Sequence, residues 1–141
     1  MIVEEIMTEG PITVTETTTI GDAMSTMAEQ GVRHLPVVRG ERSEDVIGIL
    51  SDRDFSNLGL SLVNDVESYD QLRARLTEPV SVLMTADPVT IDQDASVAEV
   101  IDMMTDDKLS AIPVVESGTQ RLVGIVSYVD VLKAARDRLD D

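Results

Sequence analysis

Two short stretches of the chain place a serine three positions before an aspartate, each at the end of an apolar run. The sequence reads "GILSDRD" up to Asp54 and "GIVSYVD" up to Asp130, with Ser51 and Ser127 at the matching places. A carboxylate just past a strand end can accept hydrogen bonds from both hydroxyls of a ribose. The serine can donate to a phosphate, aided by free N–H groups of a helix N-terminus. The spacing therefore allows a nucleotide site at each stretch.

The same aspartates also have a purely structural interpretation. Asp is a common N-cap residue, and Asp54 and Asp130 could each begin a helix in that role. Capping and ligand binding are compatible, because a carboxylate has lone pairs for both. The spacing alone leaves the two roles open.

Composition excludes several classes of function. The chain has 141 residues, of which 43% are hydrophobic, which is enough for the core of one domain or of two very small ones. It has no Cys and one His, so thiolate catalysis is excluded and a conventional metal site is not expected. A net charge of −16 argues against a nucleic-acid partner. The longest apolar runs are pentads, so no membrane segment is expected and a cytoplasmic location is predicted.

An internal duplication organises the chain. With a shift of 77, "VEEIMTEGPITV" lies over "VSVLMTADPVTI", and "HLPVV" lies over "AIPVV". After a gap of one residue, the two serine-aspartate stretches also coincide. We therefore predict two repeats, at residues 1–57 and 80–141, neither of which would bury a sufficient core alone.

Local patterns predict the same order of elements in each repeat: strand, helix, strand, strand, helix. Short strands opened by proline are expected at residues 11–14 and 88–91, followed by helices capped by Thr19 and by a Ser96–Glu99 capping box. A last helix should begin near Asp130. The fold class is thus α+β, with two related repeats packed through their sheets.

Residues 58–79 separate the repeats and are expected to form a helical linker. Six apolar residues follow each other at spacings of three or four, which predicts an amphipathic helix: Leu58, Leu62, Val66, Tyr69, Leu72 and Leu76. Packing against a core is the favoured role, and a partner-binding helix is the alternative.

The "MT..P.T" openings, the "HLPVV" and "AIPVV" segments and the "GI[LV]S..D" endings, in this order and twice, resemble a tandem pair of cystathionine β-synthase (CBS) domains, or Bateman module. The likeness covers nearly the whole chain and suggests a stand-alone CBS protein. It implies a pseudo-twofold module whose clefts bind adenine nucleotides or related adenosyl ligands. It also implies that the module commonly forms a homodimer.

The resemblance further implies that the residues before the "LPVV" strand face a cleft. Arg33 and His34 are therefore candidates to pair with a phosphate, and Arg53 lies inside the first serine-aspartate stretch. The alternatives are exposed surface charges for the arginines and a structural role for His34. In the second repeat, Tyr128 could stack on a base, although packing is the favoured role.

We expect a regulatory module that senses AMP, ADP, ATP or S-adenosylmethionine and changes its affinity for an unidentified partner protein. No cofactor is required, and the adenine nucleotide acts as the regulatory ligand. A structural CBS pair with empty clefts is the alternative. An enzyme is not expected, because the sequence has no nucleophile paired with a base, no metal set and no Walker-type loop, and hence no catalytic residue.

Overall fold

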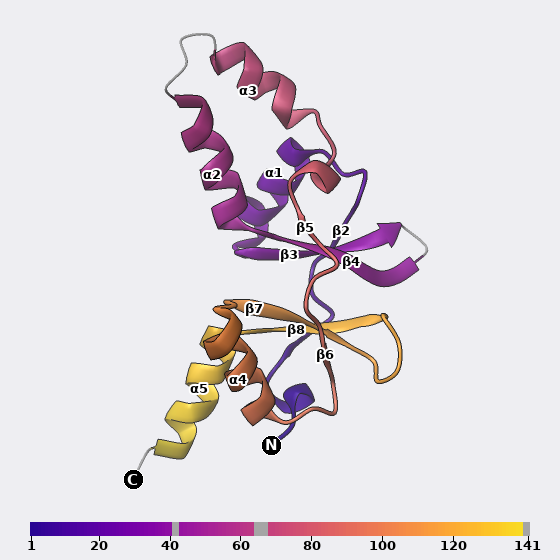
Figure 1. Ribbon diagram of the computed structural model, residues 1–141, viewed down its shortest axis with the longest axis vertical. Coiled ribbons are helices and arrows are strands. Elements are labelled where there is room, and N and C mark those ends of the chain that lie inside the picture. Colours follow the sequence, from indigo (N-terminus) through magenta and orange to yellow (C-terminus); the bar gives the residue numbers. More distant parts are fainter. Residues whose placement is uncertain (41–42, 64–67, 140–141) are drawn as a thin grey trace. The chain divides into compact units, whose positions relative to one another are not determined.

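The computed structural model describes residues 1–40, 43–63 and 68–139. The chain divides into two compact units (Figure 1). Unit 1 comprises Met1–Pro11, Glu44–Val46 and Pro88–Asp141. Unit 2 comprises Ile12–Ser43 and Ile47–Asp87. Each unit combines a four-stranded sheet with helices, which confirms the α+β class predicted from the sequence.

The sheet of unit 2 has the strand order β2-β3-β4-β5. Its strands are β2 (Val14–Thr15), β3 (His34–Gly40), β4 (Ser43–Ser51) and β5 (Thr85–Ala86). Its helices are α1 (Ile20–Gln30), α2 (Asp52–Val63), α3 (Ser68–Leu76) and the short 3-10 helix η2 (Val80–Val82).

The sheet of unit 1 repeats this plan with the order β1-β8-β7-β6. Its strands are β1 (Thr8–Glu9), β6 (Ile91–Asp92), β7 (Ala111–Val115) and β8 (Leu122–Ser127). Its helices are α4 (Val97–Asp107), α5 (Tyr128–Leu139) and the 3-10 helix η1 (Val3–Glu5).

The first helix of each repeat begins where the sequence predicts it. The Thr19 hydroxyl accepts a hydrogen bond from the Asp22 backbone N–H at 3.1 Å, and the Ser96 hydroxyl accepts one from Glu99 at 3.2 Å. Each bond satisfies one N–H that the helix itself leaves without a partner. The return bond of a full capping box, from the Ser96 N–H to the Glu99 side chain, is not formed. Gly31, with φ of 65°, ends α1 in the left-handed conformation that glycine adopts at least cost.

The proline-opened strands are shorter than predicted. Of residues 11–14 and 88–91, only Val14 and Ile91 lie in strands. β2 pairs with β3, and β6 with β7, over two residue pairs each in parallel orientation. A proline has no N–H to donate to a sheet, so the segment joins the ladder only after it.

The opening segment of each repeat packs in the unit formed mainly by the other repeat. β1 pairs antiparallel with β8, and β5 pairs antiparallel with β4. Val3 is fully buried in the core of unit 1, and Val80 is fully buried in the core of unit 2. The compact units therefore divide the chain differently from the sequence repeats. The sequence does not show which unit each opening segment joins. The two repeats have similar strands, so the segment could pair with either sheet.

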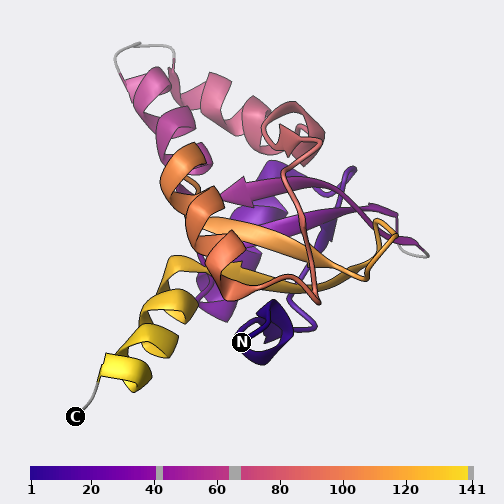
Figure 2. The ribbon, with the colours of Figure 1, turned by 60° about the horizontal axis from the view of Figure 1, so that its bottom comes forward.

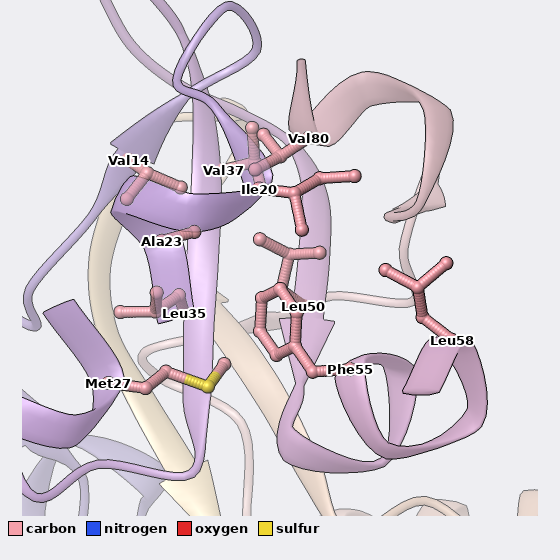
Figure 3. Packing of buried hydrophobic residues seen from close by; sticks show 10 residues of the cluster. All are labelled: Val14, Ile20, Ala23, Met27, Leu35, Val37, Leu50, Phe55, Leu58 and Val80. Atoms are coloured by element: carbon pink, nitrogen blue, oxygen red, sulfur yellow. The ribbon is translucent and has the colours of Figure 1, made fainter. Parts of the chain in front are cut away.

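The core of unit 2 gathers apolar side chains from all its main elements, as Figure 3 shows. Ile20 and Leu35 are fully buried, and Leu50 from the end of β4 packs among them. Phe55 and Leu58 extend this core along α2. The serine-aspartate stretch of this unit is thus anchored on both sides by buried residues, Leu50 before it and Phe55 after it.

A methionine covers a strand glycine in each unit. A side chain on Gly48 would collide with Met84, and one on Gly124 would collide with Met7. At Gly124 it would also lie 2.9 Å from the backbone oxygen of Thr8, in the neighbouring strand. In each unit, the glycine of the "GI[LV]S" stretch of one repeat therefore contacts the methionine of the "MT" opening of the other repeat. The sequence analysis did not predict this contact.

The region between the repeats forms two helices instead of the single helix predicted over residues 58–76. α2 continues to Val63 and α3 spans Ser68–Leu76, while Val66 lies outside the described residues. α3 contacts both α1 and α2, and its last residue packs against the core of unit 2. Tyr69 is 70% exposed and lies beside Arg73, whose guanidinium is 5.4 Å from the ring centre.

Candidate functional site

The serine-aspartate stretch of unit 2 forms the corner between β4 and α2. The Ser51 N–H donates to the Asp54 carboxylate at 2.8 Å, and the Asp54 N–H donates to the Ser51 hydroxyl at 3.3 Å. Ser51 is therefore the N-cap residue and Asp54 the third residue of the helix, in a reciprocal capping box.

Unit 1 repeats this corner between β8 and α5. The Ser127 N–H donates to the Asp130 carboxylate at 2.9 Å, and the Asp130 N–H lies 3.4 Å from the Ser127 hydroxyl. The same hydroxyl donates to the Asp130 carboxylate at 3.2 Å. The duplication of sequence is thus a duplication of hydrogen-bond geometry.

These contacts show that the N-cap role considered for Asp54 and Asp130 in the sequence analysis is wrong. Asp54 and Asp130 are not N-cap residues, because the serines hold that position. The S-x-x-D spacing was a sufficient signal for this, since a capping box joins the N-cap residue to an acidic residue three positions on. In both corners the carboxylate uses only Oδ2, and Oδ1 makes no hydrogen bond within the described part of the chain. One oxygen of each carboxylate thus remains for a ligand.

The structure brings all five candidate residues of the first repeat to the unit 2 corner. The Asp52 N–H donates to the Arg33 backbone oxygen at 2.9 Å, which joins the start of β3 to the start of α2. His34 follows as the first residue of β3, and Arg53 is the second residue of α2. Ser51 and Asp54 complete this set, so two arginines belong to the corner, Arg33 just before β3 and Arg53 in the first turn of α2.

His34 is half-buried in this corner. Burial, which disfavours the charged imidazolium, lowers the pKa of His34 below its ordinary value of 6.5. The carboxylates of Asp52 and Asp54 oppose this shift in pKa, and Arg33 adds to it. The side chain is therefore mainly neutral at pH 7.

Arg33 and Arg53 are exposed, and neither forms an ion pair with another described residue. Their guanidinium groups are free to bind an anion.

At the matching corner of unit 1, Ser110, Ala111 and Val129 stand where unit 2 has Arg33, His34 and Arg53. The Tyr128 N–H donates to the Ser110 backbone oxygen at 3.0 Å, in the same way that Asp52 bonds to Arg33 in unit 2. Ala111, which lies opposite Ser127 in the β7–β8 ladder, takes the place of His34. The two corners therefore share the carboxylate and differ in charge.

An open apolar hollow of about 250 Å³ lies beside the corner of unit 2. It is lined by Met24, Met27, Ala28, Val32, Asp52 and Phe55. Ser51 and Asp54 do not line it. Among the described residues, no three His, Asp or Glu side chains are grouped so that they could hold a metal ion. No helix within the described ranges is long and apolar enough to cross a bilayer.

Comparison with known proteins agrees with the duplicated architecture. The model of the CBS domain matches residues 3–60 and again 80–137. The A-adding tRNA nucleotidyltransferase of Aquifex aeolicus is 30% identical over 138 residues, which are 98% of this chain and 15% of that enzyme. The chain covers less than half the length of the first curated relatives that it matches.

Two solved structures share the fold over nearly the whole chain. CBSX2, determined in complex with AMP, has a TM-score of 0.80 at 23% identity, with 99% of this chain and 98% of that one covered. The CBS domain pair of protein MJ0100, determined with 5′-methylthioadenosine and S-adenosyl-L-methionine, has a TM-score of 0.77 at 24% identity, with 98% of both chains covered. This chain therefore belongs to the CBS domain family, and it contains two copies of the domain.

Proposed function

We propose that this chain is a regulatory module that binds adenosyl ligands at its two serine-aspartate corners. Asp54 and Asp130 each accept hydrogen bonds from the ribose hydroxyls of one ligand. Binding changes the affinity of the module for a protein that it regulates. The role is regulatory and not catalytic, and it requires no cofactor.

One observation carries this proposal: both capping boxes leave a carboxylate oxygen free. A capping role needs only Oδ2, which accepts the serine N–H in each corner. A ribose offers two hydroxyl donors, and a carboxylate that keeps a free oxygen can accept from them without opening the box. The helix N-termini add N–H groups that favour an anion nearby.

The cations of the unit 2 corner suit a phosphorylated ligand. Arg33 and Arg53 supply guanidinium groups, and His34 supplies a neutral imidazole in the same corner. With a net charge of −16, the chain repels an anionic nucleotide unless local cations offset that repulsion. AMP, ADP and ATP are therefore the favoured ligands at this corner.

The structural relatives support the chemical class of the ligand. CBSX2 was determined with AMP, and the MJ0100 pair was determined with 5′-methylthioadenosine and S-adenosyl-L-methionine. Both kinds of ligand contain a ribose joined to adenine. A carboxylate that recognises the ribose would accept either kind of ligand. The two carboxylates therefore favour adenosyl compounds as a class and do not select one of them.

A thermal-shift screen of the purified chain tests the proposal. The panel contains adenosine, AMP, ADP, ATP and S-adenosylmethionine, each with and without magnesium. At about a hundredfold excess over Kd, a bound ligand adds about 2.7 kcal/mol to stability, which raises Tm by several degrees. No shift with any member of the panel would favour the alternative, a structural CBS pair with empty clefts.

The role of Arg33 gives a more specific prediction. Arg33→Ala should weaken AMP binding about tenfold or more, because a charged hydrogen bond to phosphate contributes about 1.5–3 kcal/mol. Adenosine binding should change less than about twofold, because adenosine has no phosphate. Parallel calorimetric titrations of AMP and adenosine measure both effects.

Arg39→Ala is the matched control for this prediction. Arg39 is an exposed residue of β3, in the same strand as His34 and away from the capping box. Arg39→Ala removes one positive charge, as Arg33→Ala does, and should change neither affinity. Equal losses of AMP and adenosine affinity in Arg33→Ala would show that Arg33 does not recognise phosphate.

A further inference from the structure

Four positions flank each capping box, two at the beginning of a strand and two in the first turn of a helix. They are held by Arg33, His34, Asp52 and Arg53 in unit 2, and by Ser110, Ala111, Tyr128 and Val129 in unit 1. In unit 2 the Asp52 N–H donates to the Arg33 backbone oxygen at 2.9 Å. In unit 1 the Tyr128 N–H donates to the Ser110 backbone oxygen at 3.0 Å, so the backbone joins strand to helix in the same way. The duplication therefore offers two sites that share a carboxylate and differ in the side chains around it.

The unit 1 corner has no Asp, Glu, Lys, Arg or His at these four positions. Tyr128 and Val129, in the first turn of α5, are 43% and 41% exposed, so both can contact a ligand. Ser110 is exposed, and Ala111 offers only a methyl group. Unit 2 has one carboxylate and two guanidinium groups in the same places. A phosphate therefore gains no charged hydrogen bond at these positions in unit 1, whereas an uncharged group can pack against Val129.

The cations of α5 lie farther along the helix. Lys133 is one turn beyond the capping carboxylate, and Arg136 and Arg138 are in the last turn. Arg136 follows Ser127 by nine positions, which corresponds to about 13 Å along the helix axis. Figure 2 shows α5, in yellow, reaching away from the strands of unit 1 toward its C-terminal end. Of the α5 cations, Lys133 is therefore the one close to the corner.

Net charge also differs between the two units. Unit 1 contains 16 acidic and 5 basic residues, a net charge of −11, and unit 2 contains 11 and 6, a net charge of −5. Lys108, two positions before Ser110, directly follows Asp106 and Asp107, which offset its charge. A phosphate monoester such as AMP carries a charge of about −1.5 to −2 at pH 7. Unit 1 therefore repels AMP more strongly than unit 2 does, and this repulsion does not act on uncharged adenosine.

We propose that the unit 1 corner binds adenosyl ligands that carry no phosphate, while the unit 2 corner binds adenine nucleotides. The ligands of unit 1 are adenosine and derivatives whose 5′ group is uncharged or positively charged, such as a thioether or a sulfonium. Asp130 accepts the ribose hydroxyls, and the side chains around it disfavour phosphate. The inference rests on the proposed function and deepens it, because the module then responds to two classes of adenosyl compound.

Calorimetry on the full chain measures this selectivity once the unit 2 corner is disabled. Arg33→Ala together with Asp54→Asn removes a proposed phosphate contact and the proposed ribose contact there, while the Ser51 cap of α2 is retained. In this background, adenosine and 5′-methylthioadenosine should each bind at least about tenfold more tightly than AMP, because no local cation offsets the repulsion of the phosphate. In Asp130→Asn, where the unit 2 corner is intact, AMP should bind more tightly than adenosine.

Two substitutions should transfer phosphate binding to unit 1. In the same background, Ser110→Arg and Val129→Arg place guanidinium groups where unit 2 has Arg33 and Arg53. Each should strengthen AMP binding about tenfold, through a charged hydrogen bond to the phosphate, and should change adenosine binding less than about twofold. Both positions are exposed, and Tyr128 donates to the backbone oxygen of residue 110, which an arginine retains. The variants should therefore keep the fold, which circular dichroism verifies.

Two further variants are controls. Gln120→Arg adds the same charge to unit 1 in the turn between β7 and β8, at the opposite end of this strand pair from Ser127. It should change AMP affinity less than about twofold, because the added guanidinium is far from the corner. Lys133→Ala should leave the preference for adenosine unchanged, because the proposal places no phosphate beside this lysine.

AMP that binds the disabled background as tightly as adenosine would overturn the proposal. So would a background that binds no adenosine while Asp130→Asn still binds AMP, or a Gln120→Arg variant as effective as Val129→Arg. These results would leave the unit 2 corner, and with it the proposed function, in place. If no adenosyl compound binds the wild-type chain, the proposed function itself fails, and this inference fails with it.

Discussion

Replacing Asp54 with asparagine should weaken the binding of AMP at least about tenfold, because a hydrogen bond to a charged group contributes about 1.5–3 kcal/mol. The amide oxygen of asparagine can still accept the Ser51 N–H, so the cap at the start of α2 is retained. What is lost is the negative charge on the second oxygen, which we propose accepts hydrogen bonds from the ribose hydroxyls. Asp130→Asn should produce the same loss at the other corner, and the double variant should bind neither AMP nor adenosine measurably.

Isothermal titration calorimetry resolves these variants, because each should remove one binding event. Asp22→Asn is the matched control, since Asp22 is the third residue of α1 just as Asp54 is of α2, but it follows a threonine cap away from the corner. It should leave both binding events intact. If both single variants titrate like the wild type, the ribose role of these carboxylates is wrong, and the capping boxes have only a structural purpose.

Gly124→Ala should destabilise the chain by about 2–3 kcal/mol, as expected when a methyl group is forced into a well-packed contact. The new Cβ would collide with Met7 and lie 2.9 Å from the Thr8 backbone oxygen in the paired strand. A methionine side chain can move away, but the backbone oxygen is held in the sheet. The expected fall in Tm is roughly 10 °C in a thermal melt followed by circular dichroism.

Comparison with two other glycines separates the causes. Gly48→Ala should cost less, because the nearest atoms belong only to the flexible side chain of Met84. Adding Met84→Ala should recover part of that loss, whereas adding Met7→Ala to Gly124→Ala should recover little. Gly40→Ala, at the end of β3 with no atom within 4 Å of the new Cβ, should change stability by less than about 0.5 kcal/mol. If Gly124→Ala were as mild as Gly40→Ala, the contact would not constrain the strand.

Local features could be predicted from the sequence because they depend on neighbouring residues. The helix that Thr19 caps, the strands around "HLPVV" and "AIPVV" and the duplicated serine-aspartate spacing all depend on contacts within a few positions. The hydrogen bonds between Ser51 and Asp54 are also local, but the sequence analysis considered Asp54, and not Ser51, as a possible N-cap residue. The repeat itself follows from a comparison of the sequence with itself.

Features that involve distant residues required the tertiary structure. Nothing in the local sequence indicates that Val80 is buried in the core of unit 2, or that Met7 covers Gly124. The hydrogen bond from Asp52 to Arg33 brings the cations beside the capping box only after β3 and β4 have paired. Contacts between residues far apart in the chain are set by packing of the whole unit. The sequence therefore determined the repeats, the fold class and the candidate residues, whereas the exchange of opening segments and the surroundings of each carboxylate were decided by the fold.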